Sequence, residues 1–323
     1  MQVTIGGTTI DRAVTWRRIR ENAGLLAIWT VLAVMIAAAA IISPTFRSTG
    51  NIFNALRQSV FLGIVSIGQT IVIIAGGIDL SVGSTVKLVT LIAAGVMLGN
   101  EQLAAPAIVL CLGVGCVIGL VNGLIVTRLN VAPFIATLGM YSIVRGFAYG
   151  YTTAPIGSVS KSVRSIYSTQ IGPVPLPVII FAVLVIVAVI LLKLSVFGRH
   201  VYAVGGSVQV ARLSALKVDR LKIVVFVIAG FLASVAGILM VSRMVVGDPN
   251  VGEGLELDSI AAVALGGTSL LGGRGGLIGT LAGVLILAFV SNIFNLLSLD
   301  VWYQQLVRGL IILAAVAIYR QKR

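Results

Sequence analysis

The chain contains about ten separate apolar stretches, each close to the length that a helix needs to cross a bilayer. A hydrocarbon core takes roughly 20 helical residues. The stretches lie near 25–42, 61–78, 82–99, 104–126, 133–151, 176–193, 221–243, 256–270, 276–295 and 302–319. Because 58% of the residues are apolar and only 10% are charged, the chain cannot cover such stretches with a polar surface. The sequence therefore predicts an all-α integral membrane protein of about ten transmembrane helices, some of them broken or short.

The basic residues predict the orientation of the chain in the membrane. Lys and Arg are enriched in the cytoplasmic loops of membrane proteins. If the N-terminus is inside, the cytoplasmic segments hold fifteen of the 23 Lys and Arg residues. We therefore expect both termini to be cytoplasmic. The expected organisation is one membrane domain over residues 1–323, made of a cytoplasmic segment (1–24), a membrane part (25–319) with a cytoplasmic loop at 193–222, and a cytoplasmic tail (320–323).

Two predicted loops are longer than a simple reversal of the chain requires. The outer loop from Tyr151 to Pro177 holds four prolines among Ser, Thr and Gly, which favours an exposed, irregular surface. In the inner loop, Ser207 can cap a short helix that runs to about Leu216 between basic residues. Such a helix fits either a docking site for a partner or a basic loop held on anionic lipid.

Two glycine-rich sequences interrupt the apolar pattern. GGIDLSVGS at 76–84 places Asp79, Ser81 and Ser84 at or near membrane depth, where a carboxylate must face protein, water or a helix N-terminus. GGTSLLGGRGG at 266–276 shares its spacing at an offset of 190 residues, which suggests an internal repeat. Broken helices at matching positions of two halves border the substrate path in transporters. We therefore expect the second, third, eighth and ninth segments to be short or broken.

Other glycines have the spacing of helix packing. Gly115, Gly119 and Gly123 follow each other at intervals of four, as do Gly279 and Gly283. Small residues at this spacing let two helix backbones approach closely. These glycines therefore predict close helix contacts within the membrane.

Single polar residues inside the spans leave two interpretations open. Asn122 fits an interhelical hydrogen bond or, as the second possibility, a polar path. Arg145 can extend outward to the membrane surface or pair with an acid such as Glu256 or Asp258.

The chain lacks the residues for an energy source or an enzyme of its own. It contains no Gly-Lys dipeptide, and therefore no phosphate-binding loop of the G-x-x-x-x-G-K-[ST] type. Asp79 is the one plausible intramembrane acid for ion coupling, and His200 is the only histidine, predicted in a loop. Neither a nucleophile with its base nor a set of metal ligands is visible. We therefore expect a transporter subunit whose energy comes from another subunit on the cytoplasmic face.

Four longer sequences carry a family resemblance: GQTIVIIAGGIDLSVGS (68–84), APFIATLGM (132–140), GRHVYAVGG (198–206) and GLELDSIAAVALGGTSLLGGRGGLIGTLAGVLIL (254–287). With these motifs, the chain from about Leu25 to Leu313 resembles the ribose-type membrane permeases of bacterial ATP-binding-cassette importers. The resemblance implies a multi-pass protein of the inner membrane that takes up a sugar delivered by a soluble binding protein. It also implies a second permease copy, identical or different, and a cytoplasmic ATPase that binds ATP and Mg, with no cofactor or metal in this chain.

The resemblance also implies roles for particular residues. The ATPase-coupling segment would contain Gly205, Gly206, Ser207, Ala211, Arg212, Leu213 and Ser214. Ser207 and Ala215 depart from the family pattern, which usually has Asn and Gly there, so the particular ATPase partner stays open. The polar lining of the path would comprise Asp79, Ser81, Ser84, Asn122, Thr268 and Ser269.

Several alternatives remain at this point. The related branched-chain amino acid permeases carry a similar D-L-S-type motif, and nucleosides or quorum signals are further possible solutes. A self-contained secondary carrier is an alternative of another class. Neither the solute nor the identity of the second permease follows from the sequence.

Overall fold

The computed structural model describes residues 4–5, 8–9, 12–300, 302–307 and 309–310. Its helices are α1 (Arg12–Ile42), α2 (Thr49–Ile74), α3 (Val82–Met97), α4 (Ala104–Arg128), α5 (Pro133–Tyr151), α6 (Lys161–Ser168), α7 (Leu176–Lys193), α8 (Val196–Gly206), α9 (Val208–Leu213), α10 (Val218–Met244), α11 (Leu255–Leu265) and α12 (Leu277–Leu296). One 3₁₀ turn, Glu101–Leu103, precedes α4. Two antiparallel strand pairs complete this part of the chain: β1 (Thr4–Ile5) with β2 (Thr8–Thr9), and β3 (Gln170–Ile171) with β4 (Val174–Pro175).

Six helices in the described part of the chain are long and apolar enough to cross a bilayer. They are α1 from Gly24 onward, α2, α4, α7, α10 and α12. Helix α3 is apolar but has 16 residues, α11 has 11, and α5 has 19 but carries Arg145 and several tyrosines. The predicted segment 302–319 lies mostly outside the described residues. The all-α membrane class is therefore confirmed, whereas the number of ten crossings stays a prediction.

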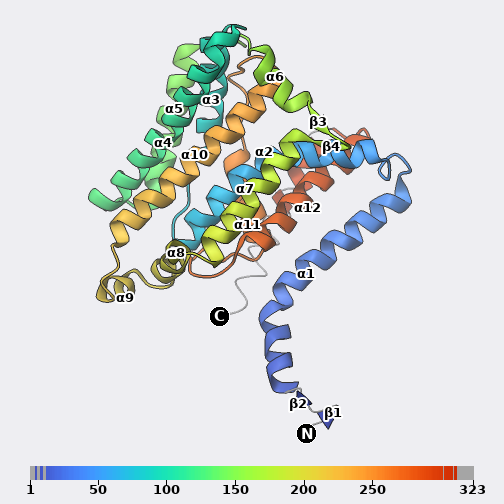
Figure 1. Cartoon of the computed structure of the whole chain (residues 1–323), viewed down its shortest axis with the longest axis vertical. Coiled ribbons are helices and arrows are strands. Elements are labelled where there is room, and N and C mark those ends of the chain that lie inside the picture. Colours follow the sequence, from blue (N-terminus) through green and yellow to red (C-terminus); the bar gives the residue numbers. More distant parts are fainter. Residues whose placement is uncertain (1–3, 6–7, 10–11, 301, 308, 311–323) are drawn as a thin grey trace.

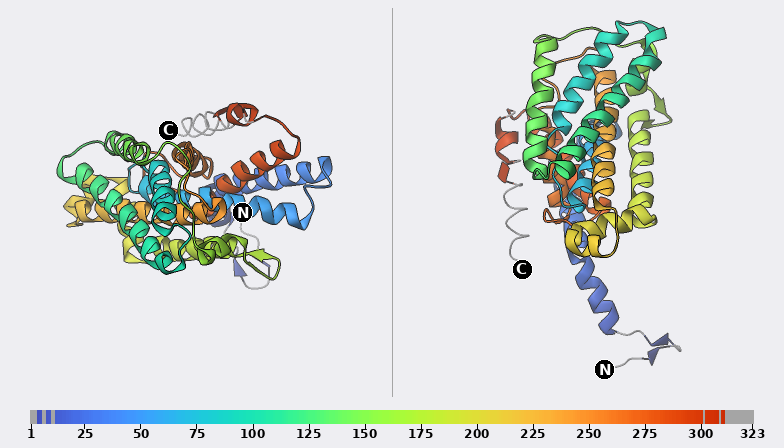
Figure 2. Two further views of the ribbon diagram at one scale, coloured as in Figure 1. Left: turned by 90° about the horizontal axis from the view of Figure 1, so that it is seen from above. Right: turned by 90° about the vertical axis from the view of Figure 1, so that its left-hand side faces the viewer.

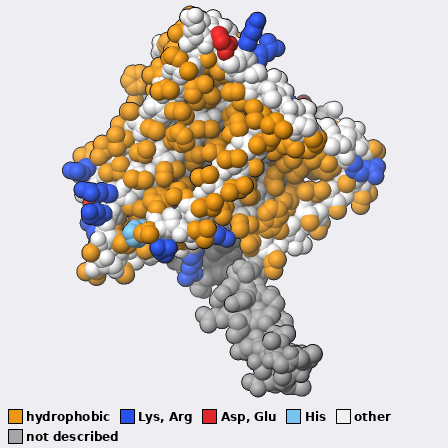
Figure 3. Space-filling model, viewed as in Figure 1, with side chains coloured by type: hydrophobic (Ala, Val, Ile, Leu, Met, Phe, Trp, Pro, Cys, Tyr) orange, Lys and Arg blue, Asp and Glu red, His pale blue; other side chains and the backbone are white. Residues whose placement is uncertain are grey.

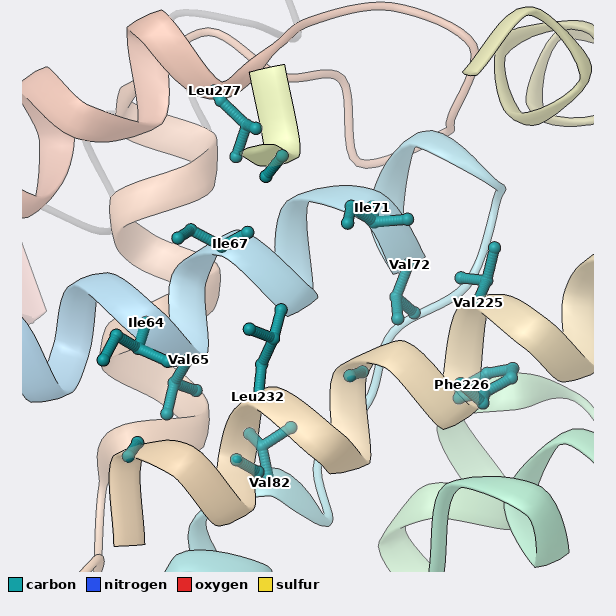
Figure 4. Packing of buried hydrophobic residues seen from close by; sticks show 14 of the residues in the cluster. Ile64, Val65, Ile67, Ile71, Val72, Val82, Val225, Phe226, Leu232 and Leu277 are labelled. Atoms are coloured by element: carbon teal, nitrogen blue, oxygen red, sulfur yellow. The ribbon is translucent and has the colours of Figure 1, made fainter. Parts of the chain in front are cut away.

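Helix α2 lies at the centre of the bundle. In the most apolar 18 residues of α2, 83% of the residues are buried, compared with 17% in the spanning part of α1. In the main hydrophobic cluster, Ile64, Ile71 and Val72 of α2 pack with Phe226 and Leu232 of α10 (Figure 4). A helix that is apolar on all sides is stable only where other helices surround it. Helix α1, by contrast, diverges from the bundle toward its N-terminal end (Figures 1 and 2).

Glycines bring α4 and α10 into backbone contact, as their spacing predicts. A Cβ on Gly115 would overlap the carbonyl of Gly230, and one on Gly119 would overlap the carbonyl of Phe226. Gly123 lies in the same way against the first part of α10. The second predicted glycine pair packs α12 on α11. The interpretation of these glycines as packing positions is therefore confirmed.

The fold contains two units that run in opposite directions, each made of a long helix, an extended linker and a short helix. Helix α2 leads through residues 75–81 into α3, and α10 leads through residues 245–254 into α11. Phe61 of α2 lies by Arg243 near the end of α10, whereas Gly68, further along α2, packs on an earlier part of α10. The two long helices are therefore antiparallel.

Both short helices begin inside the bundle. Ser81, directly before α3, hydrogen-bonds Asn122, which lies six residues before the last residue of α4. The linker 245–254 runs back along α3 until Gly252 lies against Gly83. Helices α3 and α11 are short, as the sequence predicts. The prediction of breaks in the second and ninth segments is wrong, because α2 and α12 are continuous helices of 26 and 20 residues.

The two glycine-rich turns have the same hydrogen-bond pattern, but equivalent residues are 191 positions apart and not the 190 that the sequence suggests. After α2, the N–H of Gly76 donates to the carbonyl of Ile73, and after α11 the N–H of Gly267 donates to that of Ala264. Gly76 and Gly267 both have a left-handed φ, of 81° and 85°. Residues 76 and 267, like 73 and 264, are 191 positions apart. The two turns therefore have the same local structure, and the structure aligns them one residue further apart than the sequence comparison does.

Helices α8 and α9 lie at one end of α10, and α6 packs beside its other end (Figure 1). The outer loop is less irregular than its prolines suggest, because it contains α6 and the β3–β4 hairpin. The hydroxyl of Ser160 caps α6 by accepting a hydrogen bond from the N–H of Val163 at 3.4 Å. Figure 3 shows a face that is mostly apolar, with charged side chains gathered at its edges.

Candidate functional site

The carboxylate of Asp79 lies at the start of α3. Its Oδ1 accepts hydrogen bonds from the backbone N–H and the hydroxyl of Ser81, at 2.9 and 2.6 Å. The side chain is only 1% exposed. The first N–H groups of a helix have no partner within the helix and carry partial positive charge, so they stabilise a buried carboxylate. Within the described residues, Oδ2 has no hydrogen-bond partner.

Ser81 connects this carboxylate to the neighbouring helix. Its hydroxyl accepts a hydrogen bond from Nδ2 of Asn122 at 2.8 Å, and its carbonyl accepts from the hydroxyls of Ser84 and Thr85, both at 2.9 Å. Asn122 therefore makes the interhelical hydrogen bond that the sequence allows. Four of the six predicted path residues, Asp79, Ser81, Ser84 and Asn122, thus form one buried polar network at the beginning of α3.

The beginnings of α3 and α11 meet at Gly83, which we call the half-helix junction. A Cβ on Gly83 would overlap the carboxylate of Glu256 and lie 2.7 Å from the carbonyl oxygen of Gly252, so only glycine fits. Glu256 is 8% exposed, and its Oε1 accepts from the N–H of Gly254 at 3.2 Å. Its Oε2 has no hydrogen-bond partner among the residues described. A second carboxylate is therefore buried within one turn of a helix start.

Beside this junction lies a group of charged and aromatic side chains, Lys87, Arg145, Tyr149 and Glu253, which we call the Lys87 cluster. Oε1 of Glu253 is 3.2 Å from Nζ of Lys87, 3.0 Å from a terminal nitrogen of Arg145 and 3.3 Å from the hydroxyl of Tyr149. Nζ of Lys87 lies 4.6 Å from the centre of the Tyr149 ring. The cluster therefore holds two cations around one carboxylate oxygen.

This cluster differs from the sequence prediction in two ways. Arg145 pairs with an acid, which is one of the two possibilities that the sequence leaves open, but the partner is Glu253 in the linker and not one of the two examples, Glu256 or Asp258. Lys87 was not identified as a functional residue, although a lysine within an apolar span is itself a signal of a paired or solvated site.

Thr268 and Ser269 lie in a different part of the fold from the Asp79 network. Both belong to the turn between α11 and α12. The hydroxyl of Thr268 accepts from the N–H of Gly276 at 3.2 Å, and that of Ser269 accepts from the N–H of Leu271 at 3.3 Å. These hydroxyls therefore satisfy backbone groups of their own turn.

The same turn packs without side chains against α8 and the end of α2. The N–H of Gly273 donates to the carbonyl of Ile74, the last residue of α2, at 2.9 Å. A Cβ on Gly205 in α8 would lie 2.6 Å from the nitrogen of Gly273 and would overlap the Ile74 carbonyl. The hydroxyl of Tyr202 donates to the carbonyl of Gly275 at 2.9 Å, and burial raises the pKa of Tyr202. We call the contact of Ile74, Gly205 and Gly273 the glycine seam.

The predicted coupling segment forms two helices. Ser207 caps α9 by accepting from the N–H of Val210 at 3.3 Å, as its position predicts. Helix α9 ends at Leu213, three residues earlier than expected, because Ala215 has a left-handed φ of 60°. Leu213 is 88% exposed, whereas Ala211 is 2% exposed and packs inward. Leu213 therefore lies at the outer surface of α9.

The other coupling residues hold α9 in place. Gly205 and Gly206 end α8, a helix that the sequence did not predict and in which His200 lies, so the assignment of His200 to a loop is wrong. Arg212 pairs with Asp219 in the first turn of α10 at 2.9 Å. The hydroxyl of Ser214 donates to the carbonyl of Val210, one turn earlier, at 3.0 Å. The ion pair therefore ties the C-terminal end of α9 to the start of α10.

Comparison with known proteins gives a consistent result over nearly the full chain. Residues 51–316 match the family described as the permease component of branched-chain amino acid transport systems. The ribose import permease of Escherichia coli (strain K12) is 39% identical over 97% of this chain and 99% of its own length. The ribose import permease of Bacillus subtilis (strain 168) is 39% identical over 90% and 91%, and the galactose/methyl galactoside import permease of Haemophilus influenzae is 34% identical over 96% and 97%.

No solved structure matches the chain significantly. Two features of this chain are the buried carboxylates at the starts of α3 and α11 and the exposed outer surface of α9. The family match covers both features and most of the described helices. The chain belongs to the family of permease components of branched-chain amino acid transport systems, and it is similar along its length to permeases of sugar importers.

Proposed function

We propose that the chain is the membrane permease of an ATP-driven bacterial importer for a monosaccharide such as ribose. The observation that carries this proposal is the 39% identity over 97% of the chain to a ribose import permease. A relative named for galactose and methyl galactoside import supports the same class of cargo. The match spans the half-helix junction and the coupling helices, which are the parts that transport would use.

The proposed arrangement is a single domain, residues 1–323, that crosses the inner membrane about ten times with both ends in the cytoplasm. Six long apolar helices support it, together with α3, α5 and α11 and the apolar stretch at 302–319. In this orientation α8, α9 and the turn between α11 and α12 face the cytoplasm, and α6 faces outward. The soluble binding protein would then meet the α6 end.

The proposed energy source is a separate ATPase subunit that binds ATP and Mg, while this chain itself holds no cofactor. Val210 and Leu213, three residues apart on α9, are 60% and 88% exposed, and exposed apolar side chains at a loop mark an interaction surface. A groove of about 380 Å³ beside α9 is lined in part by His200, Lys217 and Arg220. An ATPase surface with acidic groups and an apolar pocket would fit this end of the molecule.

The proposed mechanism is alternating access by a pair of permeases, identical or different. Closure of the ATPases moves α9, and the glycine seam transmits this movement to the end of α2 and to the turn before α12. Asp79, Ser81, Ser84 and Asn122 would border the path at the half-helix junction. Thr268 and Ser269 would border its cytoplasmic end. Because the binding protein selects the cargo, a weakly polar path is sufficient.

The coupling role is tested by Leu213→Asp. A charge on this exposed residue leaves the packing of α9 unchanged, so the variant should insert normally, fail to copurify with the ATPase and lose uptake. Leu297→Asp, at a 51% exposed leucine after α12, is the matched control. Normal ATPase association of Leu213→Asp would contradict the proposed docking site. Ala211 is a poor test position because its side chain is buried.

The cargo is tested by a panel of labelled solutes. Because the family is described by branched-chain amino acid transport, these amino acids are the second candidate for the transported solute. Proteoliposomes that contain the permease, its ATPase and its binding protein should take up D-ribose or D-galactose on addition of ATP. Uptake of L-leucine without sugar uptake would support the amino acid alternative, and nucleoside uptake would place the chain with another solute class.

A further inference from the structure

The Lys87 cluster has an open side on the flank of the helix bundle. The side chain of Lys87 is 2% exposed, but those of Arg145 and Glu253 are 43% and 46% exposed. Lys87 precedes the end of α3 by ten residues, and Arg145 precedes the end of α5 by six. At 1.5 Å per helical residue, the cluster lies about 9–15 Å below the ends of these helices.

Lipid cannot be the surroundings of this open side. Neighbouring side chains of α5 are exposed and apolar, with Ile143 at 53% and Phe147 at 69%. A half-exposed guanidinium and a half-exposed carboxylate at this depth are costly in hydrocarbon, and such groups face water or protein instead. The cluster therefore marks a part of the flank that borders water or a second protein, and not lipid.

The open side retains capacity for hydrogen bonds. Oε1 of Glu253 accepts hydrogen bonds from Lys87, Arg145 and Tyr149. Among the described residues, no hydrogen bond or ion pair involves Oε2. Arg145 has five N–H donors, and within the described chain they reach this carboxylate, the hydroxyl of Tyr149 and, at 3.5 Å, the hydroxyl of Tyr141, so donors remain available. The rings of Tyr141 and Tyr149 lie 5.9 and 5.5 Å from the guanidinium.

This combination fits a neutral, polyhydroxylated ring. Adjacent sugar hydroxyls can donate to Oε2 of Glu253 and accept from Arg145, while the C–H face of the ring packs on a tyrosine. We propose that the Lys87 cluster is the site at which the membrane domain contacts the transported monosaccharide, an inference that rests on the proposed import of sugars.

The test compares sugar transport with ATP consumption in the same proteoliposomes. Tyr149→Phe keeps the ring and removes the hydroxyl that reaches Lys87 and Glu253, and Glu253→Gln removes the charge at an exposed position. D-ribose taken up per ATP hydrolysed should fall about tenfold, the factor expected for one hydrogen bond to a charged group. ATP hydrolysis stimulated by the loaded binding protein should stay within about twofold. Tyr151→Phe, two residues further along α5, is the control and should behave as wild type.

The outcomes separate this inference from the proposed function. Wild-type uptake is measured first, with D-galactose as the probe if D-ribose is not taken up. If the wild type carries L-leucine and no sugar, the proposed cargo and this inference both fail. If the wild type carries sugar but the variants keep the wild-type ratio of sugar to ATP, the inference alone is wrong. A parallel loss of uptake and ATP hydrolysis would show that the cluster only supports the fold, and would also overturn it.

Discussion

Substitution of Gly205 by alanine tests the glycine seam through the size of one methyl group. The new Cβ would lie 2.6 Å from the nitrogen of Gly273 and closer still to the carbonyl oxygen of Ile74. Both are backbone atoms that cannot rotate away, so the three segments must separate. Overpacking of this kind costs about 1–3 kcal/mol. The higher helix propensity of alanine offsets up to about 1 kcal/mol of this cost.

Gly206→Ala is the matched control, because a Cβ at the adjacent position meets nothing within 4 Å. It keeps the gain in helix propensity without the overlap. The two variants should therefore differ by about 1–3 kcal/mol in stability. At about 2.1 cal/mol/K per residue, 1 kcal/mol corresponds to about 1.5 °C for 323 residues, so the unfolding midpoints in detergent should differ by about 1.5–4.5 °C.

The same pair of variants tests transmission from α9. Gly205→Ala should copurify with the ATPase as wild type does, because Leu213 and the outer surface of α9 are unchanged. Its uptake per ATP should fall, since the altered seam no longer moves the end of α2 with α8. If Gly205→Ala is as stable and as active as Gly206→Ala, the seam does not transmit force in the way described.

Two further predictions concern single positions. Ala215→Gly should raise the unfolding midpoint, because the left-handed φ of 60° costs alanine about 1–2 kcal/mol, partly offset by the greater freedom of glycine in the unfolded chain; a lower midpoint would contradict this. Gly115→Ala should lower the midpoint by separating α4 from Gly230, whereas Gly113→Ala, with open space around it, should not; equal effects would refute the packing account.

Helix limits follow from the sequence where proline or a polar group ends an apolar run. The ranges 133–151 and 176–193 coincide with α5 and α7, because proline at the first helical positions fixes both starts. The range 61–78 fails at both ends. Helix α2 begins twelve residues earlier, at a cap formed by Ser48, and the apolar residues after Ile74 form an extended linker. Apolar composition alone does not distinguish these conformations.

The sequence predicts the part of the candidate site whose residues are close together in the chain. It does not predict contacts between residues that are far apart in the chain. Asp79, Ser81 and Ser84 lie within six positions, so one helix start brings them together. Lys87 and Glu253 are separated by 166 positions, and their contact depends on the linker that folds back along α3. The sequence assigns charge to both residues but cannot select Glu253 over Glu256, because the choice is made by the path of that linker.

The most direct test of the central claim is the ATP dependence of sugar uptake. Proteoliposomes with the permease, its ATPase and its binding protein should accumulate labelled D-ribose or D-galactose only when ATP is present. Proteoliposomes that contain this chain alone should show no uptake above protein-free vesicles. Sugar uptake by the chain alone, at a rate similar to that of the full complex, would contradict the account and identify a self-contained carrier.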